Sequence, residues 1–301
     1  MIRRGCALGL LAVATSVFTT SVQAQAWLPS EHAAGIQLTT SSNLSKKHYD
    51  SHGEEVDVGH TMVYALTLGG FYSFTDRLML DASVPIISSR YDGDHPHPPS
   101  MTDTDDGNWH TTPTDLATNL HFQALLNPVA IAPYIGFVVP THDYETMGHA
   151  APGRGLNELT LGVYIARSLD QWIPNTYVQA RYNYAFVEEV AGISHDRENI
   201  DFEVGWFATP RFAIHAIYAI QDTHGGIDLP VSPDDPLFIH HDQLGAQDYD
   251  NLGGGLSFLV TKASSIYFLY NYSLDGVNGH KLDRGINIGW SYDFNEHQHH
   301  D

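Results

Sequence analysis

The amino-acid sequence predicts an all-β protein, a transmembrane antiparallel up-and-down β-barrel of about 12 strands. Three observations lead to this prediction. Apolar and polar residues alternate in one segment after another, the connections between these segments are alternately short and long, and the N-terminus has the pattern of an export signal. In a bilayer only helices and closed barrels satisfy all their backbone hydrogen bonds, so repeated strands in an exported chain favour the barrel.

The first residues have the three-part pattern of a secretory signal peptide. The basic residues Arg3 and Arg4 precede an apolar stretch, 6–18, and small residues follow up to Ala24. The tripeptide that ends at Ala24 suits signal peptidase, and the apolar stretch is shorter than the roughly 20 residues that a membrane-spanning helix needs. We therefore expect residues 1–24 to be a cleaved signal peptide.

The composition limits the classes of function. The chain has 35 Asp and Glu against 14 Lys and Arg, a formal net charge of −21. Such a chain does not bind nucleic acid by neutralising phosphates, although it can attract cations. The only cysteine, Cys6, lies in the expected signal peptide, so the mature chain would have no disulfide. No later stretch is apolar enough for a membrane-spanning helix, whereas 16 Tyr and 13 Phe suit an aromatic-girdled barrel.

The expected strands follow one another along the whole of the mature chain. After a short first strand, most are roughly 9–14 residues long, the length that a tilted strand needs to cross a bilayer. In chain order they are 35–41, 61–74, 77–91, 114–125, 130–140, 157–168, 176–187, 199–208, 212–221, 251–260, 265–274 and 284–294.

Each of these segments has one apolar face, and the other face carries charged, amide or small residues. Such alternation is typical of a strand with one face toward lipid and the other toward a polar interior. The apolar faces include Leu78, Leu80 and Val84; Leu116, Leu120 and Phe122; Leu159, Leu161 and Val163; Val178, Tyr182 and Phe186; Ile200, Phe202 and Val204; and Ile286, Ile288 and Trp290.

The connections distinguish a barrel from a β-sandwich, which shows the same alternation. Outer-membrane barrels combine short periplasmic turns with long external loops, an asymmetry that a sandwich does not need. The short connections are 75–76, 127–128, 169–175, 209–211 and 261–263. The long ones, which we expect outside the cell, are 42–60, 92–113, 141–156, 188–198, 222–250 and 275–283. A single barrel domain is thus expected over 25–294, followed by a His-rich tail over 295–301.

Short motifs resemble a known family of outer-membrane barrels. The segment Val139-Pro140-Thr141-His142-Asp143, followed by Gly153-Arg154-Gly155-Leu156-Asn157-Glu158-Leu159, is similar to a strand end and glycine-containing loop of the family labelled "MetA-pathway of phenol degradation". Asp76-Arg77-Leu78 with Ala82-Ser83-Val84-Pro85 resembles that family's third strand. The chain departs from the motif at His142, where the family usually has glycine. The resemblance implies a barrel of transporter or channel type and leaves the substrate open.

Charged residues on the expected inward faces are the candidates for solute selection. They are Asp81, Asp115, His121, Glu158, Arg181, Asp201 and Glu203. Arg181 is the basic residue in the middle of an inward face, and we expect it to form an ion pair with Glu203, with Asp201 nearer the external mouth. Two interpretations stay open, a charged constriction that selects solutes and a salt-bridge network that braces the barrel wall.

The long loops are rich in histidine and aspartate. His95, His97, His240 and His241 are candidate ligands of a divalent ion such as zinc, copper or nickel, because imidazole and carboxylate groups suit these cations. The alternative is a solvated acidic loop surface that attracts cations only diffusely.

The function expected from these features is the passive uptake or efflux of a small solute, aromatic or hydrophobic, through the outer membrane. Two alternatives are metal-ion binding or passage through the external loops, and a structural or surface-interaction barrel. No nucleophile motif indicates an enzyme. The expected partners are outer-membrane lipid and a small-molecule solute, with no cofactor unless the loops hold a metal; the oligomeric state stays open.

Overall fold

The computed structural model describes residues 25–94, 96–232 and 234–294. The expected signal peptide, 1–24, and the tail, 295–301, lie outside these residues. The strands are β1 (Ala34–Tyr49), β2 (Glu55–Val56), β3 (His60–Thr75), β4 (Leu78–Asp92), β5 (His110–Pro113), β6 (Asp115–Phe122), β7 (Ala130–Pro140), β8 (Glu158–Ser168), β9 (Thr176–Val187), β10 (His195–Thr209), β11 (Phe212–Gly225), β12 (Asp248–Leu259), β13 (Ser264–Val277) and β14 (Gly279–Asp293).

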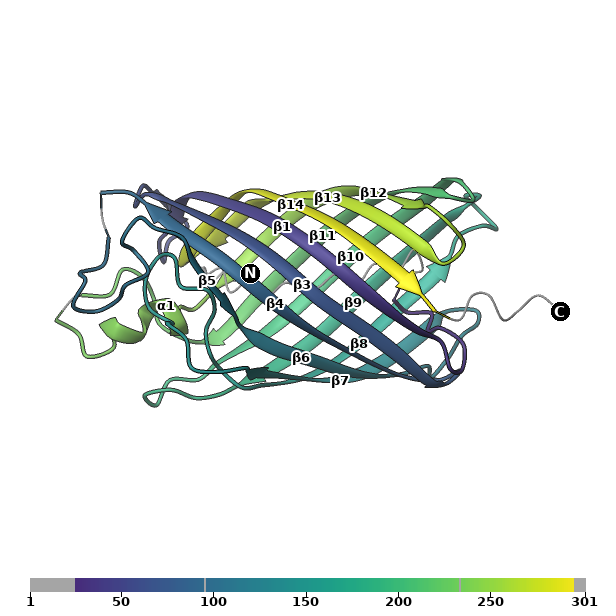
Figure 1. The fold of residues 1–301 in the computed structure, drawn as a ribbon, viewed down its shortest axis with the longest axis horizontal. Coiled ribbons are helices and arrows are strands. Elements are labelled where there is room, and N and C mark those ends of the chain that lie inside the picture. Colours follow the sequence, from purple (N-terminus) through teal and green to yellow (C-terminus); the bar gives the residue numbers. More distant parts are fainter. Residues whose placement is uncertain (1–24, 95, 233, 295–301) are drawn as a thin grey trace, which may run out of the picture.

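Twelve of these strands form the barrel wall, and two short ones, β2 and β5, pair with β1 and β4 at its rim. Each wall strand pairs antiparallel with its neighbour in the chain, and β14 pairs with β1 to close the sheet. Closure removes the edges that an open sheet would expose to lipid. The barrel is elongated, with its strands tilted to the long axis (Figure 1). The predicted fold class and strand number are confirmed.

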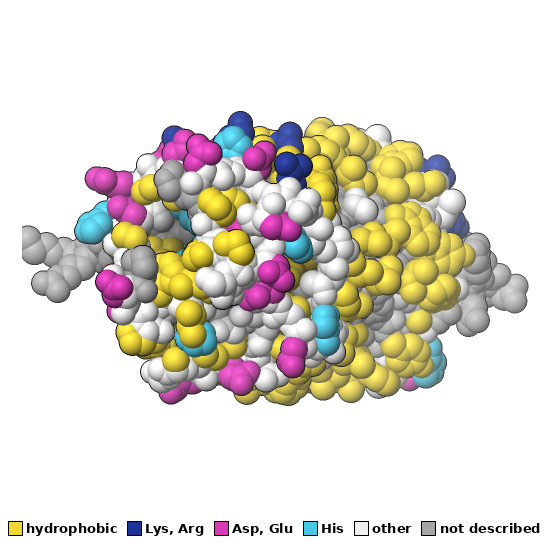
Figure 2. All heavy atoms as spheres, turned by 60° about the vertical axis from the view of Figure 1, so that its left-hand side comes forward, with side chains coloured by type: hydrophobic (Ala, Val, Ile, Leu, Met, Phe, Trp, Pro, Cys, Tyr) yellow, Lys and Arg dark blue, Asp and Glu magenta, His cyan; other side chains and the backbone are white. Residues whose placement is uncertain are grey.

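The outer surface of the wall is apolar. Large hydrophobic side chains at alternate strand positions are exposed, as the sequence pattern predicts for a face that contacts lipid. Figure 2 shows hydrophobic side chains covering the visible part of the wall, with acidic and histidine side chains gathered at the long-loop end. No helix among the described residues is long and apolar enough to cross a membrane. The exposed set includes Leu66, Leu68, Leu80, Leu120, Phe137, Leu161, Phe186, Phe202, Val204, Phe258, Phe268 and Ile288.

The two ends of the barrel differ in their connections. The short turns lie at one end, called the short-turn end, where β14 finishes (Figure 1). The other end, the long-loop end, carries connections 93–109, 141–157 and 226–247; the last contains the 3-10 helix η1 (Phe238–His240) and the helix α1 (His241–Leu244).

Three of the expected long loops are much shorter in the structure because the strands extend further than predicted. The first strand, expected over 35–41, is β1 (Ala34–Tyr49), so the expected loop 42–60 is reduced to 50–59. The expected loop 275–283 is a tight turn, since β13 continues to Val277 and β14 begins at Gly279. Its corner is Asn278, whose φ of 63° lies in the left-handed region that asparagine tolerates better than most residues. Similarly, β10 begins at His195, so the expected loop 188–198 is reduced to 188–194.

Candidate channel lumen and its mouth

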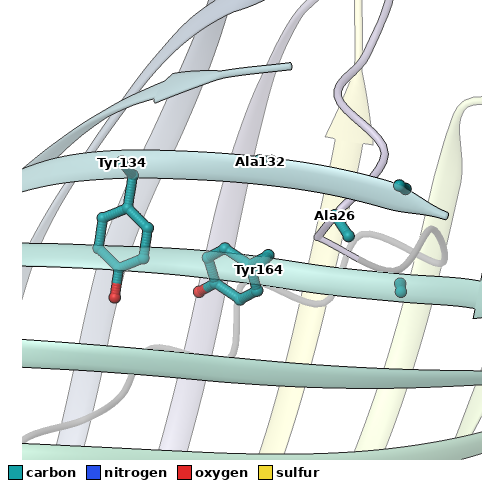
Figure 3. Close-up of a cluster of buried hydrophobic side chains, with 6 residues drawn as sticks. Ala26, Ala132, Tyr134 and Tyr164 are labelled. Carbon is teal, nitrogen blue, oxygen red and sulfur yellow. The ribbon is translucent and has the colours of Figure 1, made fainter. Parts of the chain in front are cut away.

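An N-terminal segment, 25–28, enters the lumen at the short-turn end. The backbone N–H of Ala26 donates to Gln179 Oε1 and that of Leu28 donates to Gln123 Oε1, both at 2.9 Å. Gln123 Nε2 in turn donates to the Ala26 carbonyl. Figure 3 shows Ala26 inside the barrel beside β7 and β8. The segment therefore narrows the lumen, held by side-chain hydrogen bonds and without strand pairing.

Aromatic rings line the wall next to this segment. Tyr134 and Tyr164 project from β7 and β8 with ring centroids 5.4 Å apart (Figure 3). His121 of β6 stacks on Tyr134 with ring centroids 5.2 Å apart. Tyr134 lies over Gly162 of the neighbouring strand, where a Cβ would come within 2.5 Å of the ring. Glycine at this position therefore gives the ring room to lie along the wall.

His121 and Asp81 form one charged group of the lumen, as their inward positions predicted. His121 Nε2 lies 2.5 Å from Asp81 Oδ2, and Asn119 Nδ2 donates to Asp81 Oδ1 at 2.9 Å. Next to it, a cavity of about 60 Å³ is lined by Trp27, Phe71, Asp81 and His121, among others. This volume holds a few water molecules at most, so the lumen is narrow at this level.

Arg181 does face the lumen, but the predicted partner is wrong. Its Nε donates to Asp201 Oδ2 at 2.5 Å, whereas Glu203 bonds to Tyr177 and lies 3.0 Å from His215 Nδ1. The register explains the difference. Asp201 is directly opposite Arg181 across β9 and β10, whereas Glu203 is opposite Gln179, and a directly opposite side chain is closer than a diagonal one.

A second arginine of the lumen, Arg197 of β10, pairs with Glu158 of β8. The strand between them carries the small residue Ala185 opposite Arg197, which lets the arginine side chain reach across. Sequence reasoning missed Arg197 because it started this strand at residue 199. Extending the inward alternation upward from Asp201 by two steps would have found it.

Connection 141–157 folds inward against the wall at the long-loop end. Its residues from Met147 to Leu156 are largely buried. The carbonyl of His149 accepts a hydrogen bond from Thr61 of β3, and that of Ala150 accepts one from Ser89 of β4. The loop that resembles the family motif is therefore a constriction fixed to the wall.

The candidate residue Asp115 also holds this loop. Its Oδ1 accepts a hydrogen bond of 2.6 Å from Tyr144, whose hydroxyl accepts one from the backbone N–H of Gly155. In the same loop, the buried Arg154 donates to Gln247 Oε1 at 3.0 Å. Burial removes water from the Arg154 guanidinium and so disfavours its charged form. This lowers the pKa of Arg154 to about 9.

Histidines from five segments meet at the long-loop mouth. The described candidates His97 and His241 lie together, with Nε2 atoms 3.2 Å apart. His240 is directed elsewhere, with Nδ1 3.3 Å from Gln243 Oε1, and His95 lies outside the described residues. The two that meet come from connection 93–109 and helix α1.

Sequence reasoning missed the other members of this cluster. Nε2 of His48, on β1, lies 3.1 Å from Nδ1 of His280, on β14. The ring of His149 lies between this pair and His97, and its centroid is 5.1 Å from that of His48 and 4.6 Å from that of His97. Asp105 and Asp242 flank the cluster. These residues come from distant parts of the chain, so no spacing in the sequence could bring them together.

The carboxylates set the charge of the mouth cluster. Burial disfavours the protonated imidazole of His97, but the hydrogen bond to Asp105 and the charge of Asp242 outweigh burial and raise the pKa of His97. Burial raises the pKa of Asp105 because it disfavours the carboxylate. The hydrogen bonds from His97 favour the carboxylate and outweigh burial, so the pKa of Asp105 is lowered to about 2. Asp105 is thus an anion at neutral pH.

A closed antiparallel barrel with an apolar outer surface and a charged interior is the architecture of an outer-membrane β-barrel. The predicted location in the outer membrane is therefore confirmed. The fold is similar to that of the COG4313 outer membrane channel from Pseudomonas putida F1, with a TM-score of 0.67 and 11% sequence identity over 90% of this chain and 99% of that chain. It is also similar to the translocator domain of the autotransporter NalP from Neisseria meningitidis, with a TM-score of 0.51 and 11% identity over 88% of this chain and 90% of that one.

A third similar structure is the NanC porin, with a TM-score of 0.50 and 12% identity over 86% of this chain and 100% of the porin. At these identities the likeness concerns the fold alone. No protein-family model matches the sequence, so the resemblance to the family labelled for phenol degradation is not confirmed. The comparison with curated proteins gives no match.

Proposed function

We propose that this protein is an outer-membrane channel for the passive passage of a small solute that carries an aromatic or other hydrophobic group. The observation that carries the proposal is a closed barrel whose polar interior is narrowed at both ends by segments that side chains hold in place. Wall side chains fill the interior of a barrel of about eight strands, so a 12-strand wall encloses more space than its own side chains fill. The similarity to solved channels and porins supports the same class.

The expected solute class rests on the aromatic wall at the narrow level. Tyr134, Tyr164 and His121 form a buried cluster of rings on the inner wall beside segment 25–28. Stacked or edge-to-face contacts with such rings contribute about 0.5–1.5 kcal/mol beyond burial, enough to favour an aromatic solute over a saturated one of equal size. The cavity next to His121 is too small for a ring, so passage requires segment 25–28 to move.

Planar-bilayer recording with the purified protein tests the proposal. We expect discrete conductance steps in KCl, and stronger current block by benzoate than by cyclohexanecarboxylate, which has the same charge and similar size. Replacing Tyr134 and Tyr164 together by Leu should remove the difference between the two anions while the steps persist. Absence of steps in wild-type protein would favour a structural barrel, and equal block by both anions would refute the aromatic preference alone.

A further inference from the structure

The mouth cluster contains a set of three ligand atoms with the spacing of a metal site. Nε2 of His97 and Nε2 of His241 are 3.2 Å apart, and Asp242 places Oδ2 3.7 Å from the first and Oδ1 3.4 Å from the second. Zinc bonds to nitrogen and oxygen of about 2.0–2.2 Å at tetrahedral angles separate neighbouring ligand atoms by about 3.3–3.6 Å. The observed separations, two of which involve different oxygens of Asp242, lie within about 0.1 Å of this range, and one ligand atom of each residue lies within 4.8 Å of the other two.

The hydrogen bonds around the two imidazoles fix which nitrogen has a lone pair. Nδ1 of His241 faces the carbonyl oxygen of Phe238, which can only accept, so this nitrogen carries the proton. Nδ1 of His97 faces the ionised carboxylate of Asp105 at 2.7 Å and donates to it. When both rings are neutral, their Nε2 lone pairs point at each other, a repulsive contact that either a bound cation or a proton on His97 turns into an attractive one. Carboxylate or carbonyl acceptors behind the rings are the usual support of metal-bound histidine.

We propose that His97, His241 and Asp242 bind a divalent cation of the zinc class, with His97 held in place by Asp105. Two imidazoles and one carboxylate suit zinc and its neighbours, and they leave a fourth position for water or a solute group. A cleft of about 270 Å³ lined by His241 and Asp242 gives ions and water access to the ligands. Apart from this cleft, all three ligands are buried.

The second histidine group, His48, His149 and His280, lines the same cleft and is a weaker candidate. It offers no carboxylate to balance the charge of the ion. Nε2 of His48 and Nδ1 of His280 are 3.1 Å apart and form a hydrogen bond when one ring donates and the other accepts. This pair therefore needs no metal ion to be stable.

The ion would connect three loops of the mouth. His97 belongs to connection 93–109, and His241 and Asp242 belong to 226–247. Connection 141–157 is attached to both, because the backbone N–H of Gly148 donates to Asp242 and that of Ala150 donates to Asp105. Cation binding would therefore stabilise the closed arrangement of the long-loop end.

Zinc binding by the detergent-solubilised full mature chain tests this inference. The chain should carry no purification tag and should have His297, His299 and His300 replaced by Ala, so that the tail does not bind metal. Competition with a chromophoric chelator should show about one ion per chain, and Co²⁺ should give the visible absorption of a four-coordinate site. His97→Ala, His241→Ala and Asp242→Ala should each weaken binding at least ~100-fold, and Asp105→Asn about 10–100-fold.

Matched variants separate this site from its neighbours. His240→Ala removes the adjacent imidazole and should leave affinity unchanged, as should the double variant His48→Ala with His280→Ala. Heat-modifiable migration in gels confirms that each variant barrel is folded. Absence of saturable binding, persistence of tight binding in the His97→Ala, His241→Ala double variant, or its loss in the His48→Ala, His280→Ala double variant would each overturn the assignment. None of these readouts depends on whether the barrel conducts.

Discussion

Single residues of the lumen owe their partners to the register of neighbouring strands. Arg181 and Asp201 are directly opposite, and both side chains are largely buried in the wall. Across β4 and β6, Asp81 is directly opposite Asn119, which donates to it, and it also reaches the diagonal neighbour His121. Charges of the lumen are therefore neutralised in local pairs, so that replacing one member leaves its partner as a new fixed charge.

Replacing Arg181 should change ion selectivity. Arg181→Ala leaves Asp201 without its cation, so the lumen becomes more negative and the K⁺/Cl⁻ permeability ratio should rise; Asp201→Asn should lower it. The loss of the pair should also cost about 1–3 kcal/mol of stability, between the values for surface and buried pairs. Reversal potentials in a KCl gradient measure the ratio.

Arg167 provides the control for this experiment. It lies on the outer face of β8 with its guanidinium 4.6 Å from the centre of the Trp172 ring, so Arg167→Ala removes the same charge outside the lumen. Selectivity should stay unchanged in this variant. Indifference of selectivity to both Arg181→Ala and Asp201→Asn would assign that pair to bracing the wall.

Glu55 at the rim should titrate far below an ordinary glutamate. Lys281 and Lys47 each place Nζ 2.5 Å from one of its carboxylate oxygens, and their hydrogen bonds lower its pKa from 4.5 to about 2. Because the folded-state pKa is lowered, the contribution of this group to stability is present above pH 4.5 and is lost as the pH falls toward 2.

NMR of the ¹³C-labelled side-chain carboxyl of Glu55 in micelles measures this directly. The midpoint should lie near 2 in the wild-type protein and should move toward 4.5 when Lys47 and Lys281 are both replaced by Met, which keeps most of the side-chain volume. A wild-type midpoint near 4.5 would show that the two lysines are solvated independently of the carboxylate.

At the scale of elements, the narrowing segments differ from the wall in how they are held. Wall strands are joined by continuous backbone ladders, whereas segment 25–28 is held by Gln123 and Gln179, and connection 141–157 by Thr61 and Ser89. Connection 141–157 has further bonds through Asp115, Asp105 and Asp242. The few side-chain hydrogen bonds of segment 25–28, about 1 kcal/mol each, can open without unfolding the barrel, so this segment is the part suited to gating.

Releasing the N-terminal segment should increase conductance. Gln123→Ala with Gln179→Ala removes the two acceptors that hold the backbone of Ala26 and Leu28. The single-channel conductance should rise severalfold because the lumen at the short-turn end widens. Asn199→Ala, a lumen substitution whose partner is Asn183 on the neighbouring strand, is the matched control and should have little effect. A conductance that is the same in the double variant and the wild type would place the limiting constriction elsewhere.

The whole molecule has two chemically different ends. The long-loop end gathers acidic and histidine side chains, while the short turns occupy the other end (Figure 2). Short turns are periplasmic in barrels of this type, since the loops that face the environment are the long ones. The orientation that we predict places connections 93–109 and 226–247 outside the cell.

Surface labelling of intact cells measures this orientation. An epitope inserted next to Asp235, an exposed residue of connection 226–247, should be labelled without permeabilising the outer membrane. The same epitope placed at Asp170, in the short turn between β8 and β9, should be labelled only after permeabilisation. The reverse pattern would contradict the assigned direction of the barrel.

The sequence by itself determined the barrel, because the period-2 alternation and the lengths of the connections are local properties that each strand carries alone. It also determined that Asp81, Asp115, His121, Glu158, Arg181, Asp201 and Glu203 face inward, since alternation fixes the face of a strand residue. The tertiary structure decided the partners of these residues, because partners depend on the register between strands. Arg181 pairs with Asp201, which is directly opposite, and not with the predicted Glu203. The tertiary structure alone decided that segment 25–28 and connection 141–157 enter the lumen and that His97 meets His241, since such contacts join residues that no sequence spacing relates.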